Sequence, residues 1–437
     1  MSRVTSNLPW VEDTLPTVTT VSTGKVDANH AQENGKYTFF TCAISTLKSP
    51  TYSFEGDLVI LPGNGANVGH VDFYRGKIEA YQRTYVLHNT KIYPKYVYYH
   101  LKSHWEKSTI GKQYGSATNY IKMTNFSEYR IPIPPLAEQK QIAAKLDELL
   151  AQVDTIKTRL DAILAILKRF RQSVLAAAAS GRLTEGWRDF EDFGEKVSIG
   201  EIAIDIRYGT SKKCNYESGK TPVLRIPNIG DGHLDLVDLK FAEFEEKEQK
   251  KLTLKEGDLL LIRSNGSVDL VGKVAVVTPN DTHCLFAGYL IRLRIDEAHA
   301  YAKYILYCLQ SPQTRKVIEI QARSTSGVNN INSNELAALT LFLPSIEEQT
   351  EIVHRAEQLF SFADQIEQRA KDAQTRVNHL TQSILAKAFR GELTTEWRVQ
   401  NQGLISDENS AQALLERIKS EQANLKLKKK GRKKSAA

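Results

Sequence analysis

The feature that most constrains this chain is an internal repeat. Residues 134–188 align without a gap on residues 344–398, at a constant offset of 210, and 18 of the 55 positions are identical. The identical residues gather at both ends of the segment. Each copy begins with a Pro…Glu-Gln pattern and ends with Gly-x-Leu-Thr-x-x-Trp-Arg. A repeated segment usually forms one structural unit per copy, so the chain is predicted to hold two equivalent halves, like a dimer within one polypeptide.

Both copies carry the apolar pattern of a long helix. Apolar residues recur at steps of four and three over more than four heptads, which is the spacing of a coiled-coil seam. The seam residues are Ile142, Leu146, Leu149, Val153, Ile156, Leu160, Ile163, Leu167, Phe170 and Val174, then Ile352, Ala356, Leu359, Ala363, Ile366, Ala370, Ala373, Val377, Leu380 and Ile384. Small residues in the middle of the second copy complement large ones in the first, so we expect the helices to pack on each other. The alternative is that each helix packs only on its own globular domain.

Proline and glycine mark the ends of these helices. Pro134 and Pro135 favour a helix start, and Gly181 and Gly391 stand where a C-terminal cap would. The regions before the helices also correspond, because Glu-Gly-Asp-Leu at 55–58 recurs at 256–259. Short β-rich runs at 39–44, 58–61, 223–226, 259–262 and 273–277, with one helix near 301–310, predict two α+β globular domains. The expected order is domain 1–133, helix 134–190, domain 191–343, helix 344–398, and a C-terminal segment 399–437.

Composition limits the class of protein. The sequence has neither a run of 18 apolar residues nor a cleavable signal, so a cytoplasmic protein is expected. The four cysteines show no paired spacing, which predicts reduced thiols. The net charge is +7, and residues 426–437 hold seven basic residues and no acid, so the rest of the chain is formally neutral. This tail is predicted to be a disordered, solubilising end, with phosphate binding as the minor alternative.

Motifs for catalysis are missing from the sequence. There is no Gly-x-x-x-x-Gly-Lys-Ser/Thr phosphate loop. The single Pro-Pro pair lacks the Asn or Asp before it, and the aromatic residue after it, that an amino-methyltransferase would need. Glu248-Gln249-Lys250 has the spacing of a nuclease metal site, but it lies in a solvated charged run, 243–251, and no acid in a suitable context precedes it. Ten scattered histidines form no helical metal pair. We therefore expect a non-catalytic chain without metal or cofactor.

Polar, basic and aromatic residues in corresponding turns of the two domains remain as candidates. Arginine can fork onto guanine, asparagine can bridge adenine, and lysine, serine and threonine hold phosphates. For any single residue an ordinary exposed loop side chain is the simpler interpretation, whereas the group as a whole favours DNA contact. The candidates are Lys36, Tyr37, Asn64, Asn67, Tyr81, Tyr85, Lys112, Tyr114, Ser116 and Asn119, then Arg207, Tyr208, Thr210, Ser211, Lys212, Lys213, Arg225, Asn228, Arg263, Ser264, Asn265, Arg323, Asn329 and Asn330.

The repeated motifs resemble those of the specificity subunits of type I restriction–modification systems. The resemblance covers almost the whole chain and rests on segments 134–142 and 344–349, and on 172–176 with 181–184 and their second copies. Segment 221–229 is similar to the usual opening of a target-recognition domain in that family. Segment 35–41 matches a different subtype, so the two domains should read unrelated DNA words.

The resemblance implies a fold and a mechanism. Two α/β target-recognition domains, separated by two long antiparallel coiled-coil helices in a pseudo-twofold repeat, would each read one half of a bipartite, asymmetric site in double-stranded DNA. The helices would set the unread spacer. Two modification subunits would use S-adenosylmethionine to methylate adenine, and restriction subunits would use ATP and Mg²⁺ to translocate and cut. An amphipathic helix at 411–418 would contact another subunit. The rivals are a coiled-coil scaffold with protein-binding ends and, less favoured, a fused methyltransferase.

Overall fold

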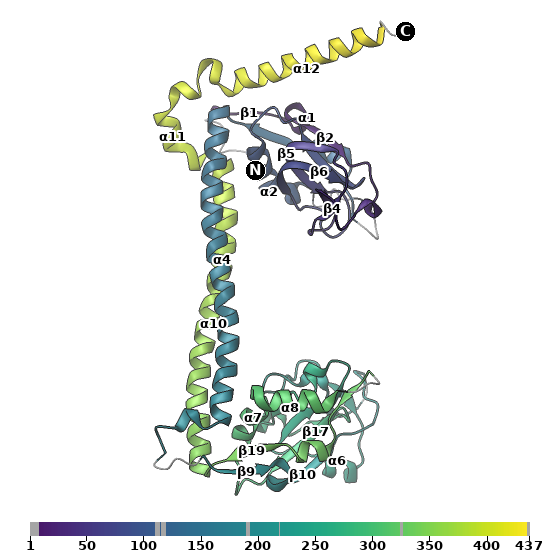
Figure 1. Ribbon diagram of the computed structural model, residues 1–437, viewed down its shortest axis with the longest axis vertical. Helices are drawn as coiled ribbons and strands as arrows, with labels where there is room; N and C mark the ends of the chain where they lie inside the picture. The colour runs from purple at the N-terminus through teal and green to yellow at the C-terminus, as the bar shows by residue number, and fades with distance from the viewer. Residues whose placement is uncertain are drawn as a thin grey trace. The chain divides into compact units, whose positions relative to one another are not determined.

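The computed structural model describes residues 8–109, 114, 119–188, 193–217, 219–323 and 327–434, with the side chains of the last helix described to residue 425. The chain divides into two compact units, one formed by residues 1–159 and 373–437 and the other by residues 160–372. Each unit contains a globular domain, part of the first long helix and part of the second (Figure 1). Two predicted DNA-binding residues, Lys112 and Ser116, lie outside the described residues.

The globular domain of the first unit is built on one six-stranded sheet. Its strand order is β2 (Thr20–Thr23), β7 (Thr84–His88), β5 (Phe54–Pro62), β6 (Asp72–Ala80), β3 (Tyr37–Phe40) and β4 (Leu47–Ser49). All neighbours are antiparallel except β3 and β6, which are parallel. Helix α2 (Pro94–Thr109) packs on β5 and β6, and the smaller pair β1 (Val11–Thr14) and β8 (Arg130–Ile133) lies apart from the main sheet. Helices α1 (Leu15–Val18) and α3 (Met123–Ser127) complete the domain.

The domain of the second unit has the same topology with one strand broken. One sheet has the order β10 (Ala203–Tyr208), β17 (Leu290–Ile295), β13 (Leu259–Ile262) and β15 (Val274–Val276), and another has β12 (Lys240–Ala242), β11 (Thr221–Leu224) and β16 (Leu285–Phe286). Here β15 and β16 stand where β6 is continuous in the first domain, because β11 pairs in parallel with β16 as β3 does with β6. A short 3-10 helix, Pro279–Asp281, separates them, and proline cannot donate to a ladder.

Most of the remaining elements of the second domain have counterparts in the first. They are β9 (Glu195–Ser198) paired with β19 (Thr340–Leu343), β14 (Ser264–Asn265) paired with β18 (Asn329–Asn330), and helices α5 (Ile199–Ile202), α7 (Ala302–Gln310), α8 (Pro312–Ala322) and α9 (Ser333–Ala337). Helix α6 (Glu246–Leu252) is specific to the second domain, because the matching stretch between β4 and β5 contains no helix. The predicted strand at 259–262 and the predicted helix near 301–310 are therefore confirmed. Leu58–Leu61 and Leu259–Ile262 are apolar runs that are buried along their whole length, as strands covered on both faces should be.

The two repeated segments form helices of 44 residues each, α4 (Leu136–Ala179) and α10 (Ile346–Phe389). Within each unit the beginning of one helix lies beside the end of the other, so the pair is antiparallel (Figure 1). The predicted caps are confirmed, since Gly181 and Gly391 follow the helices with φ of +71° and +75°. Only glycine adopts such angles without strain, and an added Cβ would also meet Phe193 or Leu8 at under 3 Å.

The seam of the coiled coil is buried at many, but not all, of its predicted positions. Ile142, Leu146, Ala356 and Ala363 are all 3% exposed or less, as predicted. Two predicted seam residues, Ile156 and Leu380, are instead 41% and 46% exposed, which corrects the heptad assignment there. A straight α-helix drifts about 20° per heptad from a strict 3.5-residue repeat, so the sequence spacing overstates how far one stripe faces its partner.

The C-terminal segment returns to the first domain. After α11 (Thr395–Gln400), helix α12 (Ala411–Lys434) begins with four buried apolar residues, Ala411, Leu414, Leu415 and Ile418. The Gln422 amide donates to the Thr17 carbonyl at 2.8 Å, and Lys419 pairs with Asp13 at 2.7 Å. The predicted helix at 411–418 is confirmed, and these contacts place it against α1 and β1.

Candidate nucleic-acid interface

Some functional candidates of the second domain lie where three strands meet at one end of a sheet. Strands β10 and β13 end there and β17 begins there, because Tyr208 pairs with Ile291 and Ile262 pairs with Leu290. The loops that follow β10 and β13 and the loop that precedes β17 therefore lie side by side. We call this end the loop edge, and it brings together Tyr208, Arg263 and Tyr289, which are far apart in the sequence.

Arg263 is held at the loop edge by its backbone and by an aromatic ring. Its N–H donates to the Tyr289 carbonyl at 2.9 Å, and its own carbonyl accepts from Ile331 at 2.8 Å. The guanidinium carbon lies 4.5 Å from the centroid of the Tyr208 ring, a favourable cation–π arrangement. The Tyr208 hydroxyl accepts from the Ser333 N–H at 2.7 Å, which fixes the ring. Two predicted residues, Tyr208 and Arg263, thus form one structure.

Two other cations of the predicted site, Lys212 and Arg225, each form an ion pair with an acidic side chain. Lys212 binds Glu248 at 3.1 Å. Arg225 binds Asp238 at 3.0 Å, and its guanidinium also lies 5.8 Å from the centroid of the Tyr216 ring. A hydrogen bond to Tyr216, together with Arg225, holds the pKa of Asp238 below its ordinary value. These charges are already neutralised within the protein.

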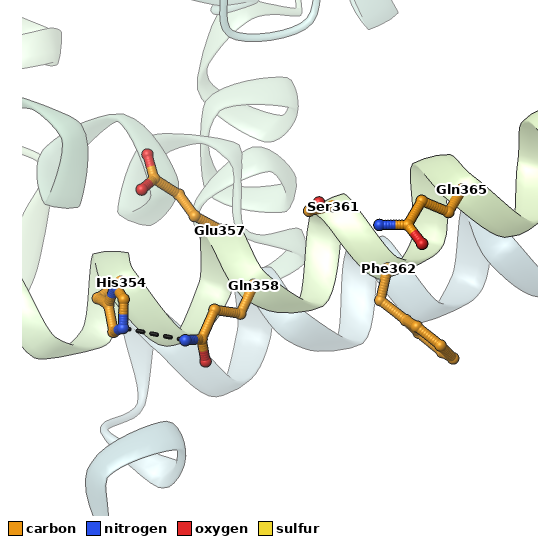
Figure 2. A pocket seen from close by; sticks show the side chains of 6 residues that line it. All are labelled: His354, Glu357, Gln358, Ser361, Phe362 and Gln365. Carbon is orange, nitrogen blue, oxygen red and sulfur yellow. Dashed lines mark hydrogen bonds between the residues drawn. The ribbon is translucent and has the colours of Figure 1, made fainter.

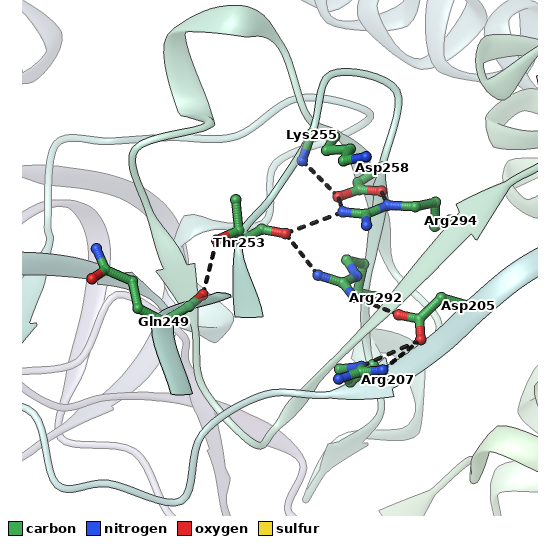
Figure 3. A network of polar contacts seen from close by, with 8 residues as sticks. All are labelled: Asp205, Arg207, Gln249, Thr253, Lys255, Asp258, Arg292 and Arg294. Carbon is green, nitrogen blue, oxygen red and sulfur yellow. Dashed lines mark hydrogen bonds and ion pairs between the residues drawn. The ribbon is translucent and has the colours of Figure 1, made fainter. Parts of the chain in front are cut away.

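Arg207 belongs to a network on the face of the sheet rather than to the loop edge. It binds Asp205 at 2.9 Å, and Asp205 also pairs with the buried Arg292 (Figure 3). Arg292 donates to the Thr253 carbonyl at 2.8 Å, so the network ties the end of α6 to the sheet. Burial alone would raise the pKa of Asp205, but hydrogen bonds from the two arginines bring it below its ordinary value. We therefore assign Arg207 a structural contact.

Several polar candidates support the loops that carry the edge. Asn228 is buried, accepts from the Arg225 N–H at 2.8 Å, and donates to the Asp235 carbonyl at 2.8 Å. Thr210 is also buried and donates to Glu248 at 3.1 Å. Ser264 and Asn265 pair with Asn330 and Asn329 in the β14–β18 ladder. Ser211, Lys213 and Arg323 are exposed.

The first domain has the same edge with different side chains. The Gly63 N–H donates to the Arg83 carbonyl at 2.9 Å and the Gly63 carbonyl accepts from Ile121 at 2.9 Å, which are the two contacts that Arg263 makes. Gly63 therefore stands where the second domain has Arg263. An added Cβ at Gly63 would meet the Arg83 carbonyl at 2.2 Å, so no side chain fits there without movement.

Two exposed tyrosines and a lysine line the edge of the first domain. Tyr114 and Tyr120 exchange backbone hydrogen bonds at 2.9 and 3.0 Å, and Tyr120 also pairs with Asn64. The Lys122 ammonium lies 4.0 Å from the centroid of the Tyr114 ring and 5.7 Å from that of Tyr120. Asn119 is exposed, and its carbonyl accepts from Gly65 at 2.8 Å. The structure thus joins three predicted residues, Asn64, Tyr114 and Asn119.

The other candidates of the first domain are engaged or lie away from this cluster. The Tyr85 hydroxyl donates to the Ile121 carbonyl at 3.2 Å, and burial raises its pKa. The Asn67 amide donates to the Cys42 carbonyl at 2.8 Å, and Tyr81 is half-buried beside Val26.

Tyr37 begins strand β3, and Lys36 lies in the turn before it. The Lys36 ammonium is 5.6 Å from the centroid of the Tyr37 ring, and the Tyr37 and Tyr52 ring centroids are 4.9 Å apart. Both tyrosines are partly exposed. This pair therefore forms a second surface group in the first domain, distinct from Tyr114, Tyr120 and Lys122.

Sequence reasoning missed several residues at the two edges. Tyr289 is 64% exposed and gives its carbonyl to Arg263, yet nothing near it in sequence marks it. Tyr120 and Lys122 lie just after the predicted Asn119 and could have been found as an aromatic–basic pair. Tyr216, 61% exposed with Lys240 at 4.8 Å from its ring centroid, has the same composition but needs the β11–β12 pairing to be recognised.

The identical ends of the repeat meet each other across the helix pair. In the first unit, the buried Glu138 of copy one accepts from Thr394 of copy two at 2.7 Å and pairs with Arg398. In the second unit, Glu348 accepts from Thr184 at 2.6 Å and pairs with Arg188 at 3.1 Å. We call these reciprocal contacts the helix clamps.

The arginine of each clamp also satisfies the glycine cap of its own helix. Arg188 donates to the Gly181 carbonyl and Arg398 to the Gly391 carbonyl, both at 2.7 Å. The identical Glu, Thr, Arg and Gly of each copy therefore act together. This explains why the identities of the repeat concentrate at the two ends of the segment.

The glutamine beside each clamp ties its helix to the adjacent globular domain. Gln139 accepts from the Tyr93 N–H at 2.8 Å and donates to the Pro134 carbonyl at 2.7 Å. Gln349 accepts from the Tyr301 N–H at 2.7 Å and donates to the Pro344 carbonyl at 2.8 Å. Each helix therefore packs on its own domain as well as on the other helix, so the two predicted arrangements coexist.

A shallow hollow of about 410 Å³ lies along the second copy of the repeat. It follows α10 and is lined by His354, Glu357, Gln358, Ser361, Phe362 and Gln365 (Figure 2). Phe362 is 59% exposed, and Gln152 stands at the matching position of the first copy. The exposed phenylalanine of this hollow is therefore not repeated in the first copy, unlike the residues of the clamps.

The thiols behave as predicted, and no metal group is found in the described ranges. Cys42, Cys214, Cys284 and Cys308 are all free, and burial raises the pKa of Cys284 and of Cys308 to about 12. Across those same ranges, no group of three or more His, Cys, Asp and Glu side chains could hold a metal ion. None of the described helices has the length and apolar character to cross a membrane.

Known proteins share this arrangement. A family described as the type I restriction modification DNA specificity domain matches residues 7–165 and again residues 192–374. The EcoKI specificity subunit of Escherichia coli K12 is 46% identical over 325 residues, which are 74% of this chain and 70% of that protein. The EcoDI specificity subunit of Escherichia coli is 37% identical and covers 98% of both chains. A solved chain of a type I R-M system has a similar fold, with a TM-score of 0.68 at 19% identity over 88% of this chain and 98% of that one.

Proposed function

Because the chain belongs to the family of type I restriction–modification DNA specificity proteins, we propose that it is the DNA-reading subunit of such a system. Residues 1–133 and 191–343 serve as target-recognition domains, and each reads one half of a bipartite, asymmetric site in double-stranded DNA. The observation that supports this most strongly is one scaffold present twice with different side chains at its edge: Gly63 with Tyr114, Tyr120 and Lys122 in one domain, and Arg263 with Tyr208 in the other.

The chemistry belongs to partner subunits in this proposal. Two modification subunits bind S-adenosylmethionine and methylate one adenine in each half-site. Restriction subunits add ATP- and Mg²⁺-dependent translocation and cleavage. This chain supplies the address, and it is a specificity subunit rather than an enzyme. The two domain matches to the DNA specificity family support one half-site for each domain.

The test is to express the chain with its modification subunit in cells that lack other adenine methyltransferases and to map N6-methyladenine across the genome. We expect methylation at one bipartite motif with two constant words and an unread spacer, and none when either protein is omitted. Gel shifts of the assembled complex on that motif and on scrambled duplexes should show sequence-dependent binding. A scaffold with protein-binding ends would give neither result.

The paired helices are proposed to set the spacer. One heptad inserted in each helix, between Leu160 and Ile163 and between Ala370 and Ala373, adds about 10 Å of helix at 1.5 Å per residue. That length corresponds to about three base pairs at 3.4 Å each, and a whole heptad keeps the seam in register. The methylated motif should retain both words and gain a longer spacer. An unchanged spacer in a folded variant would show that the helices do not set it.

A further inference from the structure

Within the described part of the second domain, the guanidinium of Arg263 at the loop edge has no acceptor. Arg225 has Asp238, Arg207 has Asp205, and the Lys212 ammonium has Glu248. A buried Nε without a hydrogen-bond partner occurs in Arg263 and also in Arg188, Arg225 and Arg292, but each of the other three guanidiniums is paired with a carboxylate. For Arg263 the described residues offer no carboxylate, so the remaining donors of its guanidinium are left for a ligand.

The geometry holds this guanidinium ready for a planar partner. Both backbone hydrogen bonds of Arg263 are made, to Tyr289 and Ile331, so its Cα position is fixed. Its guanidinium carbon lies over the Tyr208 ring, and the ring is held in turn by the Ser333 N–H. A guanidinium fixed in one plane presents two parallel N–H donors, which match the O6 and N7 acceptors of guanine in the major groove.

We propose that Arg263 reads a guanine in the half-site of the second domain and that Tyr208 is the residue that positions it. This rests on the proposed function. The first domain cannot make the same contact because Gly63 occupies the corresponding place. A guanine read in this way therefore belongs to one half of the DNA site only. The exposed Tyr289 flanks the same position.

The decisive experiment uses the unaltered protein. The complex of this chain with its modification subunit is measured against duplexes that carry the mapped site, with 7-deazaguanine placed at one guanine of the second half-site at a time. This analogue lacks the N7 acceptor and keeps O6. We expect about fivefold or greater weakening at one guanine and none at the others, because half of a bidentate contact is lost.

Variants of the chain then assign that effect to Arg263. Arg263→Ala should lose about 5-fold to 150-fold in preference for this guanine over the other bases, the equivalent of about 1–3 kcal/mol, and should no longer distinguish guanine from 7-deazaguanine. Arg263→Lys keeps the charge but not the planar fork, and it should lose the preference as well. Tyr208→Phe should retain the preference and Tyr208→Ala should not. Arg207→Lys, whose guanidinium is bound to Asp205, is the matched control and should leave every base preference unchanged.

Four outcomes would overturn the inference. If Arg263→Ala weakens DNA binding equally on all duplexes, and the salt dependence of binding falls by the amount expected for about one phosphate contact, the arginine is a phosphate ligand. A second half-site without guanine, or insensitivity of the unaltered complex to 7-deazaguanine at every position, would also contradict it while the proposed function stands. The absence of any bipartite site would remove both the inference and the proposed function.

Discussion

The loop edges of the two globular domains share a backbone and differ in chemistry. In both, the residue that follows the central strand, β5 or β13, donates its N–H to the loop before the neighbouring strand, β7 or β17. Its carbonyl accepts from the N–H of an isoleucine, Ile121 or Ile331. At that position the first domain has a glycine and the second an arginine. The first domain places Lys122 over two tyrosines, whereas the second places Arg263 over one. In the proposed function, this common scaffold with different edge residues would let one architecture read two unrelated DNA words.

The largest effect on the methylated DNA motif is expected when one whole globular domain is exchanged. Residues 195–343 are replaced by the matching domain of the EcoDI relative, which aligns along 98% of both chains. The boundaries keep β9 and β19 together, because these strands pair with each other through the whole of β19. One half of the methylated motif should change completely, since each edge reads alone.

The unexchanged half serves as the internal control, and methylome mapping of the hybrid reads both halves at once. If both words change, the two domains do not read independently and the comparison of separate edges fails. A hybrid that methylates nothing is checked for binding to the modification subunit before its result is interpreted.

The helix clamps should respond alike in the two units, in contrast to the edges. Glu138→Ala leaves the largely buried Arg398 without its carboxylate, and Glu348→Ala does the same to Arg188. Removal of one partner of a buried ion pair destabilises a protein by about 3–5 kcal/mol. Both variants should therefore lower the urea midpoint of unfolding by similar amounts and leave the methylated motif unchanged.

The control for the clamp variants is Glu148→Ala. Glu148 is an exposed residue of α4 for which the described residues provide no partner, so its replacement should change stability by less than about 0.5 kcal/mol. A large loss for one clamp and none for the other would show that the repeat is not reciprocal in energy, although it is reciprocal in geometry.

The scaffold could be predicted from the sequence because local patterns dictate it. Heptad spacing gave both 44-residue helices, positive-φ glycines gave their ends, and continuous apolar runs gave the central strands β5 and β13. The seam was overextended at Ile156 and Leu380, because spacing alone does not include the drift of a straight helix.

The arrangement of the edge residues could not be predicted in the same way. Arg207, Arg225 and Arg263 have the same side chain and each lies near a strand end. What separates them is the acid that each one meets in the fold. Arg207 binds Asp205 and Arg225 binds Asp238, whereas Arg263 meets no carboxylate among the described residues. Tyr289 reaches the edge because β17 begins beside the end of β13, a pairing that sequence does not reveal.

Lys122 should contribute less than Arg263 and in a different manner. An ammonium is a point charge without a planar fork, so at the edge of the first domain it suits a phosphate rather than a base. Lys122→Ala should weaken binding equally on matched and mismatched duplexes and reduce the slope of log K against log salt by about 0.9. Fluorescence anisotropy at several salt concentrations measures both. Loss of preference at one base position would instead make Lys122 a base reader.

The smallest effect is expected at helix α12, which packs on the first domain and has no counterpart in the described part of the second. Helix α12 packs on β1, and Lys419 pairs there with Asp13 at 2.7 Å. The register of β9 with β19 puts Val197 at the position that corresponds to Asp13. Burial would raise the pKa of Asp13, but hydrogen bonds from Lys419, Thr14 and Thr17 bring it below its ordinary value.

A carboxylate with a lowered pKa stabilises the folded form above its ordinary pKa of about 4, and that stabilisation is lost as the pH falls through the lowered value. Docking of α12 should therefore weaken below about pH 4, and Lys419→Ala should remove this dependence and cost about 0.2–1 kcal/mol, as a partly exposed ion pair does. Hydrogen exchange of residues 411–425 measures how well α12 is protected at each pH.

Arg417→Ala on the exposed face of the same helix is the control and should behave like the unaltered chain. If protection of α12 falls with pH equally in Lys419→Ala, another group holds the helix. The second domain, with Val197 in this place, should show no such transition near β9.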